Sequence, residues 1–114
     1  MKTKNSEVNI KALLPQLKNK FPLIEDVCKM YNGDNYEVTI TSGNDGKHMK
    51  ESLHYKNAAI DIRTFDMRMP RYTTKMLQTN LGKDFDVIYE TNHIHIAFCL
   101  LLEAVQHDSL WEIA

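Results

Sequence analysis

The chain has 114 residues, enough for one hydrophobic core and too few for two independent domains. Its 43% hydrophobic and 25% charged residues are typical of a globular protein and exclude a disordered or fibrous class. The formal net charge of -1 gives no overall basic field, so we expect no nucleic-acid partner. We therefore expect residues 1–114 to form a single domain.

Targeting and redox signals are weak in this sequence. The first ten residues are polar and charged and lack the apolar stretch of a secretory signal. The longest apolar run, Ile94–Leu102, contains His95 and is too short to cross a bilayer. Cys28 and Cys99 lie far apart in apolar stretches and form no CxxC pair, so each is expected to be a buried free thiol. We expect a chain made in the cytoplasm, without a transmembrane segment.

The first third of the chain predicts helical structure followed by one strand. Apolar residues recur at intervals of three and four from Val8 to about Met30, which indicates an amphipathic helix. Two prolines interrupt this pattern, so we expect two short helices or one kinked helix that stops at Asn32-Gly33. Residues 36–41 alternate as a half-buried strand does, and residues 42–46 predict a loop.

The remaining residues predict a strand, a helix and a hairpin. Residues 58–63 are a strand candidate, and residues 70–81, which begin with a proline and precede a glycine, predict a helix. Residues 85–89 and 93–98 predict two tightly joined strands, and a closing helix is expected within residues 100–114. The sum indicates an α+β domain in which helices flank a small antiparallel sheet.

Alternation within two of these strands places polar side chains on one face. His93 and His95 are two residues apart and project together, while the isoleucines beside them point into the core. The same alternation directs Asp61 away from the core, because its two flanking isoleucines point inward. Exposed strand histidines and a solvated aspartate would give the same pattern, so alternation alone leaves both interpretations open.

Two short motifs together indicate a metal site. His54 stands seven residues before Asp61, and the residues between them can turn so that both side chains reach one point. Two histidines and one aspartate suit zinc, with a fourth position left for water. Glu90 precedes His93 and His95 and could take a proton from such a water. The joint occurrence of HxxxxxxD and ExxHxH in this order favours a single zinc site in a groove on the sheet.

Residues 52–61 and 89–95 resemble the group that joins D-Ala-D-Ala carboxypeptidases, phage peptidoglycan endopeptidases and the hedgehog signalling domain. The resemblance covers roughly residues 36–98, and the paired motif is its specific part. It implies the fold of this group, with one zinc ion in a groove on the sheet.

The resemblance also implies a role for each motif residue. His54, Asp61 and His95 would hold the zinc ion, Glu90 would be the general base, and His93 would stabilise the oxyanion. Some members carry an acidic residue three positions before the liganding histidine, which would make His93 the third ligand instead.

Residues around the motifs bear on the ligand. His48 matches a histidine that hedgehog-like members place beside the metal, where it could contact water or substrate. Asn57 replaces the usual glycine and suits the same left-handed backbone. The arginine that many of the carboxypeptidases use for the substrate carboxylate is missing, and Lys47, Lys50 or Arg63 could substitute. The acidic cluster that binds calcium in hedgehog domains is nearly absent.

From these features we predict a zinc peptidase that hydrolyses stem or cross-link peptides of bacterial peptidoglycan, as a D-Ala-type carboxypeptidase or an endopeptidase. Such an enzyme could reach the cell wall after phage-type release. The alternative is a hedgehog-like module in which zinc stabilises a partner-binding surface without turnover.

Overall fold

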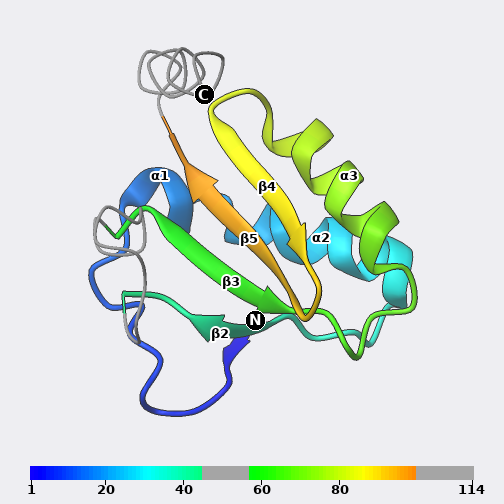
Figure 1. Cartoon of the computed structure of the whole chain (residues 1–114), viewed down its shortest axis with the longest axis horizontal. Coiled ribbons are helices and arrows are strands. Elements are labelled where there is room, and N and C mark those ends of the chain that lie inside the picture. The colour runs from blue at the N-terminus through cyan, green and yellow to red at the C-terminus, as the bar shows by residue number, and fades with distance from the viewer. Residues whose placement is uncertain (45–56, 100–114) are drawn as a thin grey trace.

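The computed structural model describes residues 1–44 and 57–99. The elements, in chain order, are β1 (Lys2–Thr3), α1 (Pro15–Lys18), α2 (Phe21–Asn32), β2 (Thr39–Ser42), β3 (Ala59–Arg63), α3 (Pro70–Leu81), β4 (Phe85–Glu90) and β5 (His93–Phe98). The strands form one sheet in the order β1-β2-β3-β5-β4. Helices α1 and α2 lie behind this sheet and α3 runs beside β4, so no helix of the described residues covers the other face of the sheet (Figure 1).

The predicted α+β class is confirmed, but the sheet is mixed and not purely antiparallel. β2, β3, β5 and β4 pair antiparallel, whereas β1 pairs parallel with β2, with Lys2 opposite Thr39 and Thr3 opposite Ile40. β1 has only two residues. A segment this short shows no alternation, so no sequence pattern predicts it.

The helical prediction from Val8 onward is correct only from Pro15. Residues 8–14 form no helix, because their backbone groups bond elsewhere: the Asn9 carbonyl accepts the Asn44 N–H at 2.8 Å, and the Leu14 N–H donates to the Asn57 carbonyl at 2.9 Å. Two helices follow, α1 and α2, which confirms the expectation of two short helices over that of one kinked helix. No helix within the described residues is long and apolar enough to cross a membrane.

The other predicted elements are found close to their expected bounds. The strand expected at residues 36–41 is shifted to Thr39–Ser42, because the Tyr36 N–H turns back to the Gly33 carbonyl at 3.0 Å. β3, α3 and the β4–β5 hairpin agree with the predictions. The closing helix expected within residues 100–114 lies outside the described residues.

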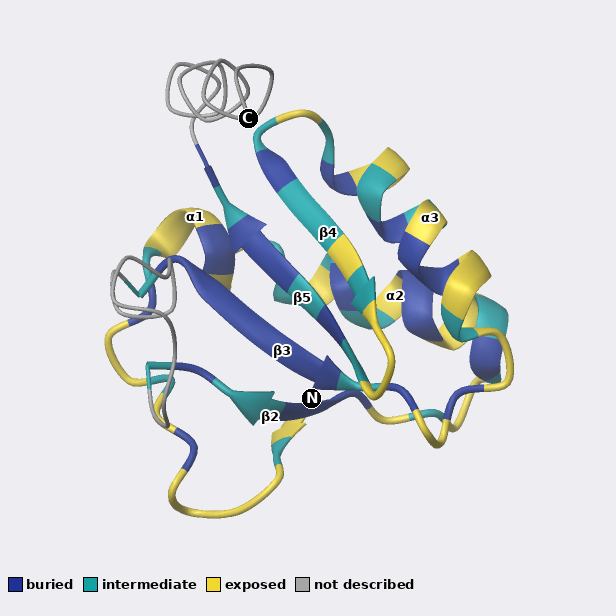
Figure 2. Ribbon diagram, in the orientation of Figure 1, coloured by how far each residue is buried: buried dark blue, intermediate teal, exposed yellow. Residues whose placement is uncertain are grey.

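The core lies between the sheet and the helices (Figure 2). Its fully buried side chains include four strand isoleucines from β3 and β5, namely Ile60, Ile62, Ile94 and Ile96. Cys28 and Cys99 are buried thiols that form no disulfide, as expected. Burial raises the pKa of the Cys28 thiol to about 12, so this thiol stays protonated at neutral pH.

One side chain of α3 covers the outer edge of β4. The Gln78 amide Oε1 accepts the Val87 N–H at 3.0 Å, and its Nε2 donates to the carbonyls of Phe85 at 2.7 Å and Gly82 at 3.1 Å. An edge strand with free N–H and C=O groups is a template for pairing with another chain. Gln78 therefore fixes the β4–β5 hairpin to α3 and blocks part of this edge.

We expect Gln78→Ala to lower the free energy of unfolding by about 1–3 kcal/mol, because it leaves the partly buried Val87 N–H without its acceptor. Chemical denaturation followed by circular dichroism measures the change. Thr79→Ala, at an exposed position of the same helix, is the matched control and should stay within about 0.5 kcal/mol of wild type. Equal stability of the two variants would contradict the role given to Gln78.

Candidate functional site

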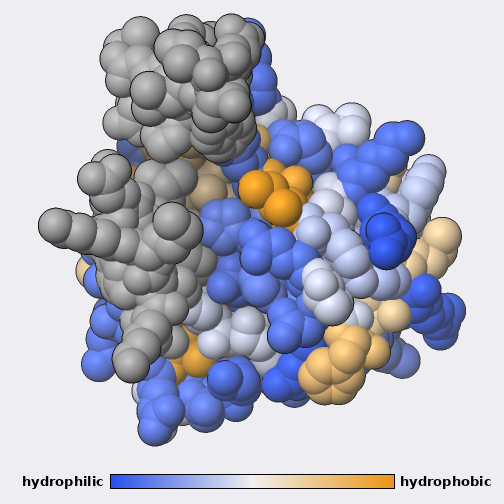
Figure 3. All heavy atoms as spheres, viewed as in Figure 1, coloured by the Kyte–Doolittle hydropathy of each residue, from blue (hydrophilic) through white to orange (hydrophobic). Residues whose placement is uncertain are grey.

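The pairing of β3 with β5 brings the predicted residues together. In this antiparallel register Asp61 lies opposite His95, and Arg63 lies opposite His93. Hydrophilic side chains gather over β3 and β5 on the face that the helices do not cover (Figure 3). The predicted face for these residues is therefore correct.

Asp61 and His95 form a polar pair across the two strands. Asp61 Oδ1 lies 3.0 Å from His95 Nδ1, and both side chains are largely shielded from solvent, with 12% and 19% of their surface exposed. Asp61 Oδ1 also lies 3.8 Å from His93 Nε2. One carboxylate oxygen thus faces two imidazole rings, and the ring of His95 is the nearer.

Glu90 contacts His93, three residues along the hairpin. Its Oε2 lies 3.1 Å from His93 Nε2, and the other ring nitrogen, Nδ1, lies 2.6 Å from Asn92 Oδ1. Each nitrogen of this ring faces an oxygen, so the ring donates to both when it carries two protons. The Glu90 side chain is half exposed, which leaves its carboxylate accessible to a molecule on this face.

The donor atoms fit part of a zinc site. Ligands of a tetrahedral zinc at about 2.0–2.2 Å lie about 3.3 Å from each other, close to the separation of Asp61 Oδ1 and His95 Nδ1. Imidazole nitrogen and carboxylate oxygen are also donors that zinc accepts. Within residues 1–44 and 57–99 no three His, Cys, Asp or Glu side chains form a complete metal site. The third predicted ligand, His54, lies outside the described residues, as do Lys47 and His48.

A hollow of about 410 Å³ adjoins His93, and its lining consists of Lys4, Thr41, Arg63, Phe65, Asn92 and His93. Arg63 and His93 are predicted site residues. The others come from the position after β1, from β2, from the segment after β3 and from the hairpin turn. No motif joins residues so far apart, so only the sheet order could have identified them.

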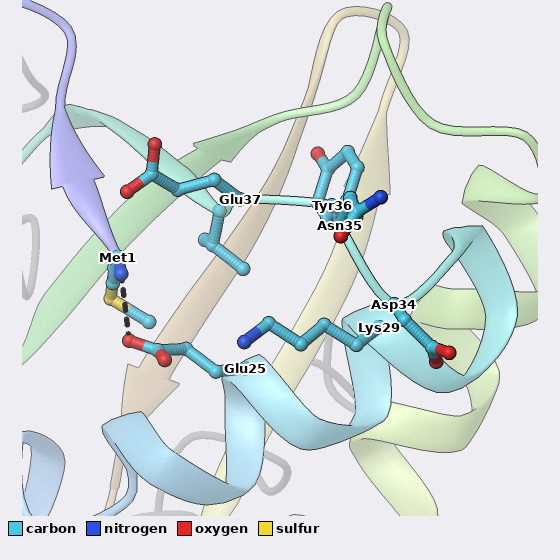
Figure 4. A pocket seen from close by; sticks show the side chains of 8 residues that line it. Met1, Glu25, Lys29, Asp34, Asn35, Tyr36 and Glu37 are labelled. Carbon is cyan, nitrogen blue, oxygen red and sulfur yellow. Dashed lines mark ion pairs between the residues drawn. The ribbon is translucent and has the colours of Figure 1, made fainter.

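A second hollow of about 270 Å³ lies between Met1, α2 and the segment that leads into β2 (Figure 4). There the Met1 ammonium group pairs with Glu25 Oε1 at 2.9 Å. None of the predicted site residues lines this hollow. The predicted site residues that the structure describes therefore lie on the sheet face away from the helices.

The turn that leads into β3 has a left-handed backbone. Asn57 has a φ of 59°, the conformation expected for a residue that replaces glycine, and its carbonyl accepts the Leu14 N–H at 2.9 Å. This bond fixes the position of the chain just before β3, the strand that carries Asp61.

Residues 3–97 match the family model of the hedgehog amino-terminal signalling domain. The chain is 39% identical over 71 residues to the Sonic hedgehog protein of Danio rerio, a match that covers 60% of this chain and 17% of that protein. The Tiggy-winkle hedgehog protein of Danio rerio and the Sonic hedgehog protein of Xenopus laevis are each 38% identical over 71 residues. These matches cover 60% of this chain and only 17% and 16% of the two relatives. The hedgehog part of the predicted resemblance is thereby confirmed, whereas the peptidase part stays a prediction.

We expect Asn57→Gly to keep the free energy of unfolding within about 0.5 kcal/mol of wild type, because glycine adopts a positive φ freely. Asn57→Val should lower it by about 1–2 kcal/mol, since a β-branched residue is strained in this region. Thermal and denaturant unfolding of the two variants measure the difference. A valine variant as stable as the glycine variant would show that this turn does not constrain β3.

Proposed function

Because this chain belongs to the hedgehog amino-terminal signalling domain family, we propose that it is a zinc-stabilised binding module whose uncovered sheet face contacts a partner. The observation that carries the proposal is the pair of donor atoms on adjacent strands, Asp61 Oδ1 and His95 Nδ1, 3.0 Å apart. The family relationship supports binding as the main function, since the relatives are named hedgehog proteins and the matched family is a signalling domain. The chain spans a small part of each relative, so we extend none of their other properties to it.

Asp61, His95 and His54 are the residues that would hold the metal. Zinc bound there would join β3 to β5 and would supply a positive charge on an otherwise mixed surface. His95 is preferred over His93 as the ligand because its ring nitrogen is the closer to Asp61 Oδ1, at 3.0 Å against 3.8 Å. His93 would then stay available to contact a bound molecule.

A second candidate function is the peptidoglycan peptidase, which Glu90 favours. A zinc ion with a purely structural role needs no base beside it. Yet the half-exposed Glu90 carboxylate lies 3.1 Å from His93, on the face that carries Asp61. In a peptidase Glu90 would accept the proton of the attacking water, and His93 would donate a hydrogen bond to the oxygen of the scissile carbonyl.

Metal binding provides the first test of the proposal. We expect the wild type to bind one zinc ion per chain. Asp61→Ala and His95→Ala should each weaken zinc binding by more than about 100-fold, which is more than the loss of a residue that only hydrogen-bonds to a ligand causes. His93→Ala should retain the ion. Competition with a chelating dye measures the affinities, and elemental analysis gives the stoichiometry.

Asp86→Ala is the matched control for the zinc test. Asp86 lies on β4 opposite Ala97, on the same face as Glu90, but outside the Asp61–His95 pair. It should bind zinc as the wild type does. Loss of zinc in His93→Ala with retention in His95→Ala would reverse the ligand assignment, and full retention in Asp61→Ala would refute the site.

Hydrolysis separates the two candidate functions. For a binding module we expect no release of peptides from purified peptidoglycan by zinc-loaded wild type, measured by chromatography of the soluble products. Release that Glu90→Gln abolishes, with zinc content unchanged, would establish the peptidase instead. Glu37→Gln, at an exposed position paired with Lys2, controls for the loss of one surface carboxylate.

A further inference from the structure

The hollow beside His93 is positively charged and has no assigned ligand. We propose that it binds a carboxylate side chain of an extended segment of a partner protein, with an adjoining apolar side chain on Phe65. The proposal rests on the function proposed above and specifies the chemistry of the partner. Lys4 and Arg63 supply the charge, and the hollow has room for a side chain, with a volume of about 410 Å³.

The charge of the lining is unbalanced. Lys4, Arg63 and His93 are its ionisable residues, and no acidic residue lines the hollow. Within the described residues neither Lys4 nor Arg63 forms an ion pair, whereas the neighbouring Lys2 is paired with Glu37 at 3.5 Å. Two cations without a counterion on one concave surface favour an anionic ligand.

Arg63 is held in a position that suits a carboxylate. Its guanidinium carbon lies 4.8 Å from the centroid of the Phe65 ring, which is a cation–π contact. This contact leaves the fork of N–H donors at the edge of the planar guanidinium group available to a ligand. Such a fork matches the two oxygens of a carboxylate. Stacking of this kind reduces the side-chain freedom that Arg63 would lose on binding.

Phe65 indicates that the ligand also has an apolar part. Its side chain is 79% exposed, although burying a large aromatic ring away from water is favourable. An arginine beside an exposed aromatic ring is typical of protein-binding surfaces, where both residue types are enriched. A peptide with adjacent acidic and apolar residues satisfies both features.

Polar groups at the rim can bind the peptide backbone. Asn92 Oδ1 lies 2.6 Å from His93 Nδ1. Within the described residues the two N–H donors of the Asn92 amide form no hydrogen bond, so they can donate to a ligand oxygen. His93 also borders the Asp61–His95 pair, through its 3.8 Å approach to Asp61. The hollow and the proposed metal site are therefore adjacent, with His93 between them.

The surroundings favour a peptide over a nucleic acid. A nucleic acid presents a run of phosphates and needs a stripe of cations. Here the carboxylates of Asp61 and Glu90 approach His93, which lines the hollow, and would repel a polyanion; the net charge of the chain is -1. A single carboxylate carries one negative charge and matches the two cations of the lining, Lys4 and Arg63.

The test uses the full chain loaded with zinc and two blocked tetrapeptides. One is acetyl-Ala-Phe-Asp-Ala-amide, and the other carries asparagine in place of the aspartate. We expect the aspartate peptide to shift the backbone amide signals of Lys4, Arg63, Phe65 and His93 in nuclear magnetic resonance titrations. It should bind at least about threefold more tightly than the asparagine peptide, the effect expected of a partly exposed ion pair.

Matched variants assign the preference to the hollow. Arg63→Gln and Lys4→Gln should each remove the preference for aspartate, whereas Lys2→Gln, on the same edge of the sheet, should keep it. Equal shifts with both peptides, shifts located elsewhere or no shifts would overturn the proposal. A short oligothymidylate that shifts the same four residues at lower concentration than the aspartate peptide would overturn it in favour of nucleic acid.

The two proposals fail in different ways. Zinc content is measured separately on each sample, and Arg63→Gln should bind zinc as wild type does because Arg63 is no proposed ligand. Zinc bound at one ion per chain, without a preference for aspartate, would refute the hollow alone. A wild type that binds no zinc would refute the metal site, and the peptide titration would still report on the hollow.

Discussion

The pairing of β3 with β5 is the constraint on which the rest of the site depends. Ile60 and Ile62 on one strand and Ile94 and Ile96 on the other are fully buried against the helices. Because side chains alternate along a strand, this burial directs Asp61 and His95 to the opposite face, and the register places them side by side. A slip of one residue would expose the isoleucines, so the free energy of the core also maintains the alignment of the polar pair.

Two kinds of chemistry meet on the resulting face. The imidazole rings of His93 and His95 both lie near the Asp61 carboxylate, an arrangement suited to a metal ion. Lys4 and Arg63 line a neighbouring hollow and make it cationic. His93 lies between the two parts, and Glu90 Oε2 contacts its Nε2 at 3.1 Å. A change at His93 would therefore affect metal environment and ligand contact together, while changes at Arg63 or His95 separate them.

The sequence predicted those features that depend on local periodicity. Alternation located the polar face, and the replacement of glycine by Asn57 correctly indicated a positive φ. Features that depend on distant pairing were missed. The apolar spacing of residues 8–14 resembled a helix, yet their backbone bonds to Asn44 and Asn57, and β1 gains its structure only from β2. The hollow escaped prediction for the same reason, because Lys4 and Arg63 meet only in the folded sheet.

The distance along the chain between Asp61 and His95 has a consequence for folding. The two residues are separated by 34 positions, so their contact forms only after α3 and the hairpin have been placed. Contacts of such long range are entropically costly to close and form late when the ordered segments between them must first be brought together. A metal or partner that binds both residues together requires the assembled sheet. It would act on the completed sheet by slowing its opening, and the lifetime of the native state would then depend on occupancy.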